Sequence, residues 1–385
     1  MGLSRSRTNQ LELPLSFGVE PQAWSGSFNA RESSLHQVAP FVGKMKSGMA
    51  RQLVLHYTKS GDTVLDPFCG SGVVPLEAAL LGRHTIGNDL SPYAYTITYA
   101  KLFAPESAKA ALDLAEHYLT EIEAKSPHRT LEDVPGWIQG FFHPRTLREI
   151  LVAVEVLQRD SSFFLLACLM GILHHVRPGF LSYPASHLTP YLRSKKYPPD
   201  HYPDMYRYRD LRSRLLAKVE RAYRRHIPIA PSVRRRALSC NAMSLPLPDA
   251  SVDAIISSPP YFGALDYARD NRLRLWFLGV HDHKDLERSL TANDKVYVPE
   301  MRQCLSEFAR VLKPSAPCVL VLGDVTRNGR HRCTADTISQ LASEAGDGKL
   351  FQKESLLDDT IPDERRSRRG TKTTLVERIL TLRRR

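Results

Sequence analysis

Hydrophobic residues recur along this chain with two spacings, and each spacing predicts a different kind of element. Short apolar runs predict buried strands at 63–66, 84–89, 252–257 and 318–324. Apolar residues three and four positions apart predict helices at 49–57, 73–81, 108–125 and 144–158. The segment 161–175 is apolar nearly all round, which is typical of a helix in a small core. Strands that alternate with helices predict an α/β fold around a mostly parallel sheet.

The composition is that of a globular chain with an excess of positive charge. With 385 residues, of which 42% are hydrophobic, the chain can bury one large core or two smaller ones. The six cysteines have no paired short spacings, so neither a zinc site nor a disulfide framework is indicated and no metal is expected. No signal-like leader or apolar run of membrane-spanning length occurs, which favours a cytoplasmic protein without membrane attachment. A net charge of +12 points to a polyanionic partner.

A strand that ends in two prolines is the first candidate for chemistry. The run from Val252 leads into Ser258, Pro259, Pro260 and Tyr261, and neither proline can donate a hydrogen bond that would continue the strand. The carbonyls of Ser258 and Pro259 are therefore fixed acceptors at a strand end, with an aromatic ring beside them. That arrangement suits a planar substrate that carries an exocyclic amino group, although an ordinary strand-terminating turn has the same pattern.

A glycine-rich turn upstream indicates nucleoside binding. The sequence LDPFCGSG, 65–72, joins a strand to a helix, and Gly70 and Gly72 let a ligand approach the backbone N–H groups. The next strand ends at Asp89, where a ribose diol would be held. Asp66, inside the turn, would repel the pyrophosphate of a dinucleotide. A carboxylate there suits an amino group and a sulfonium, which together indicate S-adenosylmethionine.

Together, the two motifs resemble those of the amino-methylating DNA methyltransferases, which modify cytosine N4 or adenine N6. In that family DPFxGSG lies under the methionine part of the cofactor, and Ser/Asn/Asp-Pro-Pro-Tyr binds the target amino group. Further segments that are similar to family elements are 41–44, 88–92, 242–249, 308–314, 318–324 and 374–382. The resemblance implies a Rossmann-like class I methyltransferase fold, with a mixed, mostly parallel sheet, and S-adenosylmethionine as the cofactor.

The resemblance also implies roles for individual residues. The catalytic residues would be Ser258, Pro259, Pro260 and Tyr261. The cofactor-binding residues would be Phe41, Lys44, Asp66, Pro67, Phe68, Gly70, Gly72, Asp89, Leu90, Asn241 and Ala242. Family members usually carry an acid where this chain has Asn241, but an amide oxygen could still accept from the adenine amino group. A Pro-Cys pair at 317–318 lies on the wrong strand for the nucleophile of a cytosine-C5 enzyme, so no covalent step is expected.

Residues 103–236 are expected to form a helical and basic insertion between the two halves of the catalytic domain, 1–102 and 237–385. The part 191–236 holds fourteen Lys and Arg against four Asp and Glu, with six tyrosines among them. Such a composition suits a DNA target-recognition surface that contacts phosphates and stacks on bases, whereas a solvated surface would mix the two signs. The candidate DNA contacts are Arg207, Arg209, Arg234, Arg235 and Arg236, and the basic tract 365–372 is a further one.

The function expected from these features is transfer of a methyl group to the exocyclic amine of a base flipped out of DNA. Ser-Pro-Pro-Tyr goes more often with cytosine N4 in the resembling family, and the short Ser258 side chain suits a single-ring base that must sit close to the strand end. The alternatives are adenine-N6 methylation, an RNA amine methyltransferase, and a non-catalytic DNA-binding protein with the same fold. The expected partner is duplex DNA, with a cognate restriction endonuclease as a further candidate.

Overall fold

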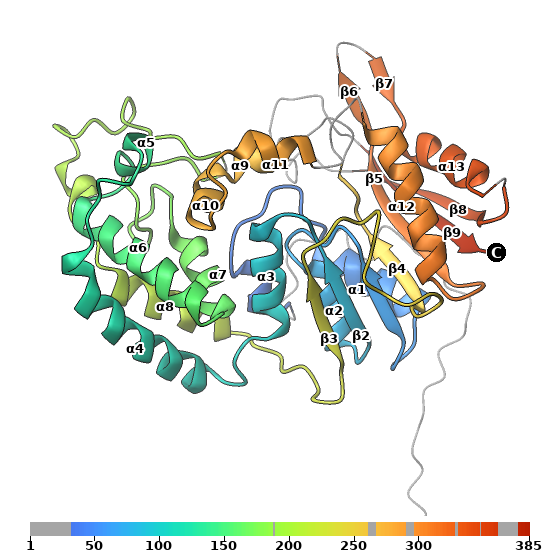
Figure 1. The fold of residues 1–385 in the computed structure, drawn as a ribbon, viewed down its shortest axis with the longest axis horizontal. Helices are drawn as coiled ribbons and strands as arrows, with labels where there is room; N and C mark the ends of the chain where they lie inside the picture. Colours follow the sequence, from blue (N-terminus) through green and yellow to red (C-terminus); the bar gives the residue numbers. More distant parts are fainter. Residues whose placement is uncertain are drawn as a thin grey trace, which may run out of the picture.

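A seven-stranded sheet forms the centre of the fold (Figure 1). Its strands are β1 (Thr63–Asp66), β2 (His84–Asn88), β3 (Arg235–Leu238), β4 (Ala254–Ser257), β5 (Pro317–Gly323), β8 (Phe351–Thr360) and β9 (Val376–Arg384), in the order β3-β2-β1-β4-β5-β9-β8. The strands from β3 to β5 are parallel, and β9 is antiparallel to both of its neighbours. The computed structural model describes residues 32–187, 189–260, 267–289, 296–327, 330–346, 348–360 and 376–385. The predicted α/β fold with a mixed, mostly parallel, Rossmann-like sheet is confirmed.

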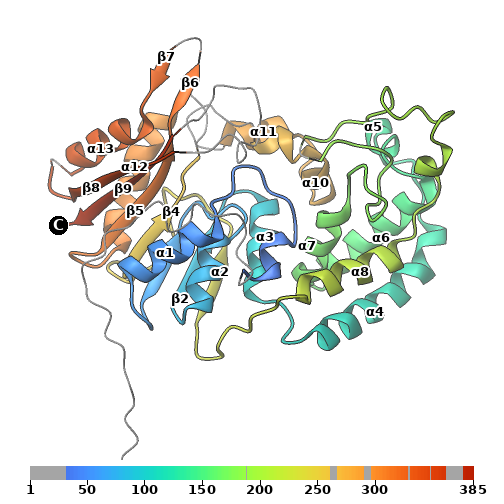
Figure 2. The ribbon, with the colours of Figure 1, turned by 180° about the vertical axis from the view of Figure 1, so that it is seen from behind.

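Helices cover both faces of this sheet (Figure 2). They are α1 (Ser47–Tyr57), α2 (Val73–Leu80), α3 (Pro92–Leu102), α12 (Tyr297–Val311) and α13 (Thr334–Glu344). Val64 and Ile256 point into a core with α1 and α2, whereas their chain neighbours Leu65 and Ile255 point into a core with α12 and α13. Because alternate side chains of a strand face opposite sides, a continuous apolar run buries both faces of a parallel sheet.

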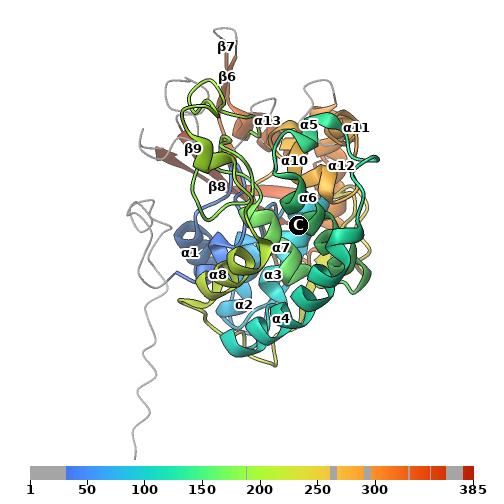
Figure 3. The same cartoon turned by 90° about the vertical axis from the view of Figure 1, so that its left-hand side faces the viewer.

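A helical body adjoins the sheet next to α3 (Figure 3). It contains α4 (Ala108–Lys125), α5 (Gly136–Gln139), α6 (Pro144–Arg159), α7 (Phe163–Ile172) and α8 (Leu211–Tyr223). In α7, residues 164–172 are all buried, so the segment that is apolar all round is the centre of this body. It packs against α3, α6 and α8, and the core of the helical body is continuous with residues of α2 and α3. In the described part of the chain, no helix is long and apolar enough to cross a membrane.

Most predicted elements coincide with observed ones, and the exceptions lie where periodicity is weak. The strand 63–66 and the helix 108–125 have the predicted bounds. The hydrophobic pattern did not predict β3 and β8. Both are edge strands, each with one side open to solvent, and their charged residues interrupt the apolar pattern. After the Pro-Pro corner the chain forms two short helices, α9 (Tyr267–Asp270) and α10 (Arg272–Phe277), and residues 261–266 lie outside the described residues.

The arm before α1, residues 32–46 as far as the structure describes it, is buried at 32–36, 38, 39 and 42. The short 3-10 helix η2 (Ser34–Gln37) lies between the helical body and α2. Lys218 Nζ of α8 donates to Gln37 O at 2.8 Å, and His36 Nε2 lies 2.7 Å from Glu77 Oε1 of α2. Since all the side chains that make these contacts are buried, the arm joins the two bodies rather than extending into solvent.

Gly171→Ala should destabilise the protein, because α7 packs directly on this arm. A Cβ at Gly171 would lie 2.2 Å from Val38 O and 3.0 Å from Lys218 Cε. We expect the unfolding free energy to fall by about 1–3 kcal/mol, as for overpacked cores, measured by urea denaturation. Gly179→Ala is the matched control, since a Cβ there meets no heavy atom within 4 Å. Equal stability of the two variants would contradict the close packing.

Candidate active site

A pocket opens beyond the carboxyl ends of β1, β2 and β4. Its lining consists of Phe41, residues 43–45, 66–71, 73–74, 88–91 and 240–242, Ser258, Pro260, Tyr267, Ala268, Asn271 and Leu286. Ligands of open α/β sheets bind beyond the carboxyl ends of the strands, where the chain crosses to opposite faces of the sheet. The pocket is therefore the candidate active site.

The structure brings most of the sequence-predicted site residues to this pocket. Of the predicted cofactor-binding residues, Gly72 alone is absent from the lining. It precedes α2 with a φ of +67°, and a Cβ there would lie 2.6 Å from Thr98 Oγ1, so its role is to let α3 approach the turn. Ser258 and Pro260 line the pocket, Pro259 is buried behind them, and Tyr261 lies outside the described residues.

Hydrogen bonds from neighbouring elements hold the glycine-rich turn. Cys69 N donates to Asn88 O at 2.9 Å, which joins the turn to the end of β2. Lys101 Nζ of α3 donates to Ser71 O at 2.5 Å. Lys101 is 1% exposed, and burial lowers the pKa of its amine well below the usual value. No sequence pattern marks this lysine, since it is the tertiary packing of α3 that brings it to the turn.

Asp66 ends β1 and carries a carboxylate that is almost fully buried. Its Oδ1 accepts from Ser257 Oγ at 2.6 Å and from Phe68 N at 3.3 Å. No hydrogen bond from a described residue reaches its Oδ2. Burial raises the pKa of Asp66 to about 7, against the two hydrogen bonds that favour the ionised form. A cationic ligand in the pocket would stabilise this charge, and Oδ2 is still able to accept from it.

Asp89 follows β2 and closes the other side of the turn. Its Oδ2 accepts from Gly70 N and its Oδ1 from Ser91 N, both at 2.9 Å. Burial raises the pKa of Asp89 to about 6, with the two backbone N–H groups acting in the opposite direction. Each carboxylate oxygen has a second lone pair, so the side chain can also accept from a diol in the pocket.

The Pro-Pro corner is joined to β5 and to the turn by two serines. Ser258 Oγ donates to Val321 O of β5 at 3.1 Å, while the preceding Ser257 makes the hydrogen bond to Asp66. Because the single hydroxyl proton of Ser258 is used in this way, its oxygen presents only lone pairs to the pocket. The corner therefore offers an acceptor to an amino group.

The remaining wall of the pocket comes from α9, from Asn271 directly before α10, and from α11 (His283–Ser289). Tyr267 lies with its ring centroid 6.5 Å from that of Phe41, and Asn271 Nδ2 donates to Tyr267 O at 3.0 Å. Asn271, which joins α9 to α10, and Leu286 of α11 complete this wall. No motif singles out these residues, because helices of four and six residues carry no periodic pattern.

The predicted DNA contacts do not gather on one surface. Arg209 is buried, and its guanidinium donates to Phe180 O at 2.8 Å and to Met205 O at 3.1 Å, so it supports the insertion and is not available to a phosphate. Arg207 is exposed and pairs with Asp204 at 2.8 Å.

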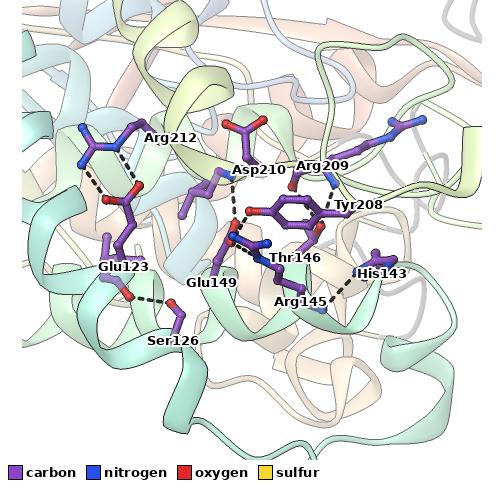
Figure 4. A network of polar contacts seen from close by, with 12 residues as sticks. Glu123, Ser126, His143, Arg145, Thr146, Glu149, Tyr208, Arg209, Asp210 and Arg212 are labelled. Atoms are coloured by element: carbon purple, nitrogen blue, oxygen red, sulfur yellow. Dashed lines mark hydrogen bonds and ion pairs between the residues drawn. The ribbon is translucent and has the colours of Figure 1, made fainter. Parts of the chain in front are cut away.

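Part of the excess positive charge of 191–236 is neutralised by acidic side chains in the folded protein. Arg212 of α8 pairs with Glu123 of α4 at 2.7 Å (Figure 4), and also with Glu116. Arg214 pairs with Asp210 at 2.7 Å. The expectation that this segment presents a single sign is wrong for α8, because α4 supplies acids that the composition of 191–236 leaves out.

The three consecutive arginines, Arg234, Arg235 and Arg236, lie at the amino end of β3. Arg235 is in register with Thr85, near the start of β2, whereas the pocket lies beyond the end of β2. Its guanidinium is half-buried and donates to Leu102 O at 2.9 Å. Arg234 and Arg236 are exposed, but at the edge of the sheet opposite to the pocket. The tract 365–372 lies outside the described residues.

The Pro-Cys pair at 317–318 lies inside the sheet. Cys318 is buried within β5, and burial raises the pKa of its thiol, which disfavours a nucleophilic thiolate. Among the described residues, no group of three or more His, Cys, Asp or Glu could hold a metal ion.

In comparisons with known proteins, a family model matches the segment that contains the glycine-rich turn. Residues 23–100 match the model of the N6/N4 methylase family, described as DNA methylase. A type II methyltransferase of Geobacillus stearothermophilus is 25% identical over 286 residues, which are 66% of this chain and 54% of that protein. A tRNA (guanine(10)-N2)-dimethyltransferase of Methanothermobacter thermautotrophicus is 43% identical over 51 residues, 13% of this chain and 15% of that one. The chain thus spans about half the length of the first relative.

Among solved structures, a methylase of Thermus thermophilus complexed with S-adenosyl-L-methionine is 23% identical, with a TM-score of 0.24, over 37% of this chain and 52% of that chain. The matched family segment contains the arm, the glycine-rich turn and Asp89, and S-adenosylmethionine is the cofactor of that family. Over residues 23–100, the chain matches the N6/N4 DNA methylase family, which is the family that its motifs resemble.

Proposed function

We propose that the protein is a DNA methyltransferase that transfers a methyl group from S-adenosylmethionine to the exocyclic amine of a flipped base. The observation that carries this proposal is the convergence of Asp66, Asp89 and Ser258 on one pocket. The family match and the type II relative support DNA as the substrate. The tRNA-modifying relative favours RNA as the second candidate, over a shorter match.

The residues present fit the proposed cofactor. When bound, S-adenosylmethionine supplies an electrophilic methyl group on a sulfonium. Asp66 Oδ2 would accept from its amino group, and Asp89 would accept from its ribose hydroxyls. Asn241 Oδ1 already accepts from Met243 N at 3.0 Å, so one lone pair is left for the adenine amino group. Two carboxylates in one partly desolvated pocket would strengthen the attraction for a cation.

Ser258 would hold the base amine in the orientation that transfer requires. An amino group that donates to Ser258 Oγ and to the corner carbonyls is turned out of the ring plane, so its lone pair conjugates less with the base. The lone pair would then be free to attack the methyl group, and this alignment would supply much of the rate. The new N–C bond would form as the S–C bond breaks, and the nitrogen would afterwards release one proton to water.

Cytosine N4 is the target atom that we propose. The hydroxyl of Ser258 is held against β5 by its bond to Val321 O, which keeps it close to the strand end. A base that reaches this acceptor has to come close to the corner, and a pyrimidine does so with less crowding than a purine. Adenine N6 is the alternative target, by the same mechanism.

Labelled cofactor, incubated with separate pools of duplex DNA, single-stranded DNA and RNA, tests the proposal. Nucleoside mass spectrometry of the labelled pool identifies the product. We expect N4-methylcytosine in duplex DNA. N6-methyladenine would change the target base but keep the mechanism, whereas label in RNA alone or 5-methylcytosine would contradict the proposed function.

Ser258→Ala should lower turnover by roughly 10²–10³-fold, the usual effect of removing one positioned hydrogen-bonding group. Cofactor affinity, measured by calorimetry, should be unchanged, because Ser258 acts on the base. Ser306→Ala, at an exposed position of α12, is the control and should be as active as the unchanged protein. Full activity of the Ser258 variant would remove this side chain from the mechanism.

Cofactor affinity should weaken as the pH falls below neutral. The pKa of Asp66 is raised to about 7 and that of Asp89 to about 6, so both carboxylates lose their charge between pH 8 and 5. We expect the Kd to rise about tenfold or more between pH 8 and pH 6. Ser257→Ala should move this dependence to higher pH, because the hydrogen bond that favours the ionised form is lost. Ser257→Thr should retain it, and identical pH profiles of all three proteins would refute the role of Ser257.

Asp66→Asn should stabilise the free protein while it abolishes cofactor binding. The pKa of Asp66 in the folded protein, about 7, lies above its ordinary value of 3.8, so the folded state binds this proton more tightly than the unfolded state. The resulting stabilisation is complete only below pH 3.8, and it is lost as the pH rises through 7. At pH 8 we expect the variant to gain about 2–4 kcal/mol in unfolding free energy, and less at pH 5. Urea denaturation at both pH values measures the gain. A loss of stability at pH 8 would contradict the cost assigned to this charge.

A further inference from the structure

Some cations of the helical insertion are neutralised by neighbouring acids. Arg212 and Arg214 of α8, for example, are paired with carboxylates. Arg193, Lys195 and Lys196, in the loop between α7 and α8, form no ion pair with a described residue. Lys195 and Lys196 are exposed, and Arg193 is half-exposed. This loop therefore carries three cations within four residues that no carboxylate of the described residues neutralises.

The loop has a defined backbone structure. Arg193 N donates to Pro184 O at 2.8 Å, and Ala185 forms a β-bridge with Leu192. Lys196 N donates to Arg193 O at 2.9 Å, which makes a turn that keeps the cations on neighbouring positions. Three like charges within four residues repel each other, and a polyanion would relieve that repulsion.

The loop is also attached to the wall of the active-site pocket. Thr189 Oγ1 donates to Asp270 Oδ1 at 2.6 Å, and the Arg272 guanidinium donates to Pro190 O. Asn271, between these two anchor residues, lines the pocket. In Figures 1 and 2, the helices α9, α10 and α11 lie between the sheet and the helical body that carries this loop. The loop thus continues outward from the pocket wall.

We propose that Arg193, Lys195 and Lys196, together with the adjacent Tyr191, form the surface that binds the phosphate backbone of duplex DNA beside the flipped base. This inference rests on the proposed function. Tyr191 is 54% exposed and directly follows the anchored Pro190, so it offers an aromatic face next to the cations. Lysine and arginine contacts to phosphates supply affinity that does not depend on sequence and decreases steeply with salt.

Other exposed cations lie in the wrong place for this role. Arg224 and Arg225 follow α8, where Arg225 O accepts from Ser34 N of the buried arm. Lys59 follows α1 and precedes β1, so it lies at the amino edge of the sheet. All three are exposed and have no ion pair with a described residue. They therefore serve as a control set of equal charge, away from the pocket.

The test compares two triple variants in DNA titrations at several salt concentrations. The loop variant is Arg193→Gln/Lys195→Gln/Lys196→Gln, and the control is Lys59→Gln/Arg224→Gln/Arg225→Gln. For the loop variant, we expect the slope of log K against log salt to decrease in magnitude by about two to three, since each phosphate contact contributes about 0.9. Cofactor affinity and melting temperature should be unchanged. For the control, we expect a change in slope of less than one.

Each outcome of the test is decisive. An unchanged slope for the loop variant, or equal changes in both variants, would overturn the proposed surface while the unchanged protein still methylates DNA. Loop-dependent binding of RNA without binding of duplex DNA would overturn DNA as the partner. Failure of the proposed function has a different signature, because the unchanged protein would then label no DNA at all.

Discussion

The hydrogen bond from Ser257 Oγ to Asp66 Oδ1 is the interaction on which the rest of the site depends. β1 and β4 are neighbours in the sheet, with Leu65 in register with Ile255, so both strands end at the same edge. The 2.6 Å bond joins those two ends and fixes the glycine-rich turn relative to the Pro-Pro corner. It also favours the ionised form of a carboxylate whose pKa burial raises to about 7. A single buried contact thus affects both the spacing and the charge of the site.

The surrounding elements hold the carboxylate of Asp66 in place, although burial disfavours its charged form. Lys101 bonds to the turn from α3, and Asp89 accepts from Gly70 N on the side of β2. The two apolar cores on opposite faces of the sheet bury β1 and β4 on both sides, which leaves their ends little freedom to move. Functional sites commonly hold an energetically unfavourable group in this way, because the favourable packing of the surrounding scaffold offsets its free-energy cost.

The parts of the site that could be predicted from the sequence are those whose conformation is decided locally. Two prolines end a strand wherever they occur, and Gly70 between a strand and a helix allows a turn with a positive φ of 48°. Asn271 and Lys101 could not be found in this way, because tertiary packing alone brings them to the pocket.

In the insertion, the pairing of charges likewise could not be predicted from the sequence. Counting signs along 191–236 suggested one basic surface, but Arg212 finds its carboxylate at Glu123, which is 89 residues away in the chain. The arm before α1 is a further case. Its sequence lacks periodicity, yet η2 is buried because Lys218 and Glu77 bond to it from two different bodies. Composition predicts the total charge of a segment, but the fold decides which charges remain unpaired.

The charges of the pocket also restrict where a polyanion can lie. Asp66 and Asp89 place two carboxylates at the end of the sheet, which would attract a cationic cofactor and would repel phosphates. An uncharged base can enter such a pocket, whereas the phosphates on either side of it have to be held outside. The loop with Arg193, Lys195 and Lys196 meets this requirement, because its anchors reach the pocket wall while its cations do not belong to the lining. Separation of the anionic pocket from the cationic loop would therefore help to extrude the base, since the backbone and the base are attracted to different places.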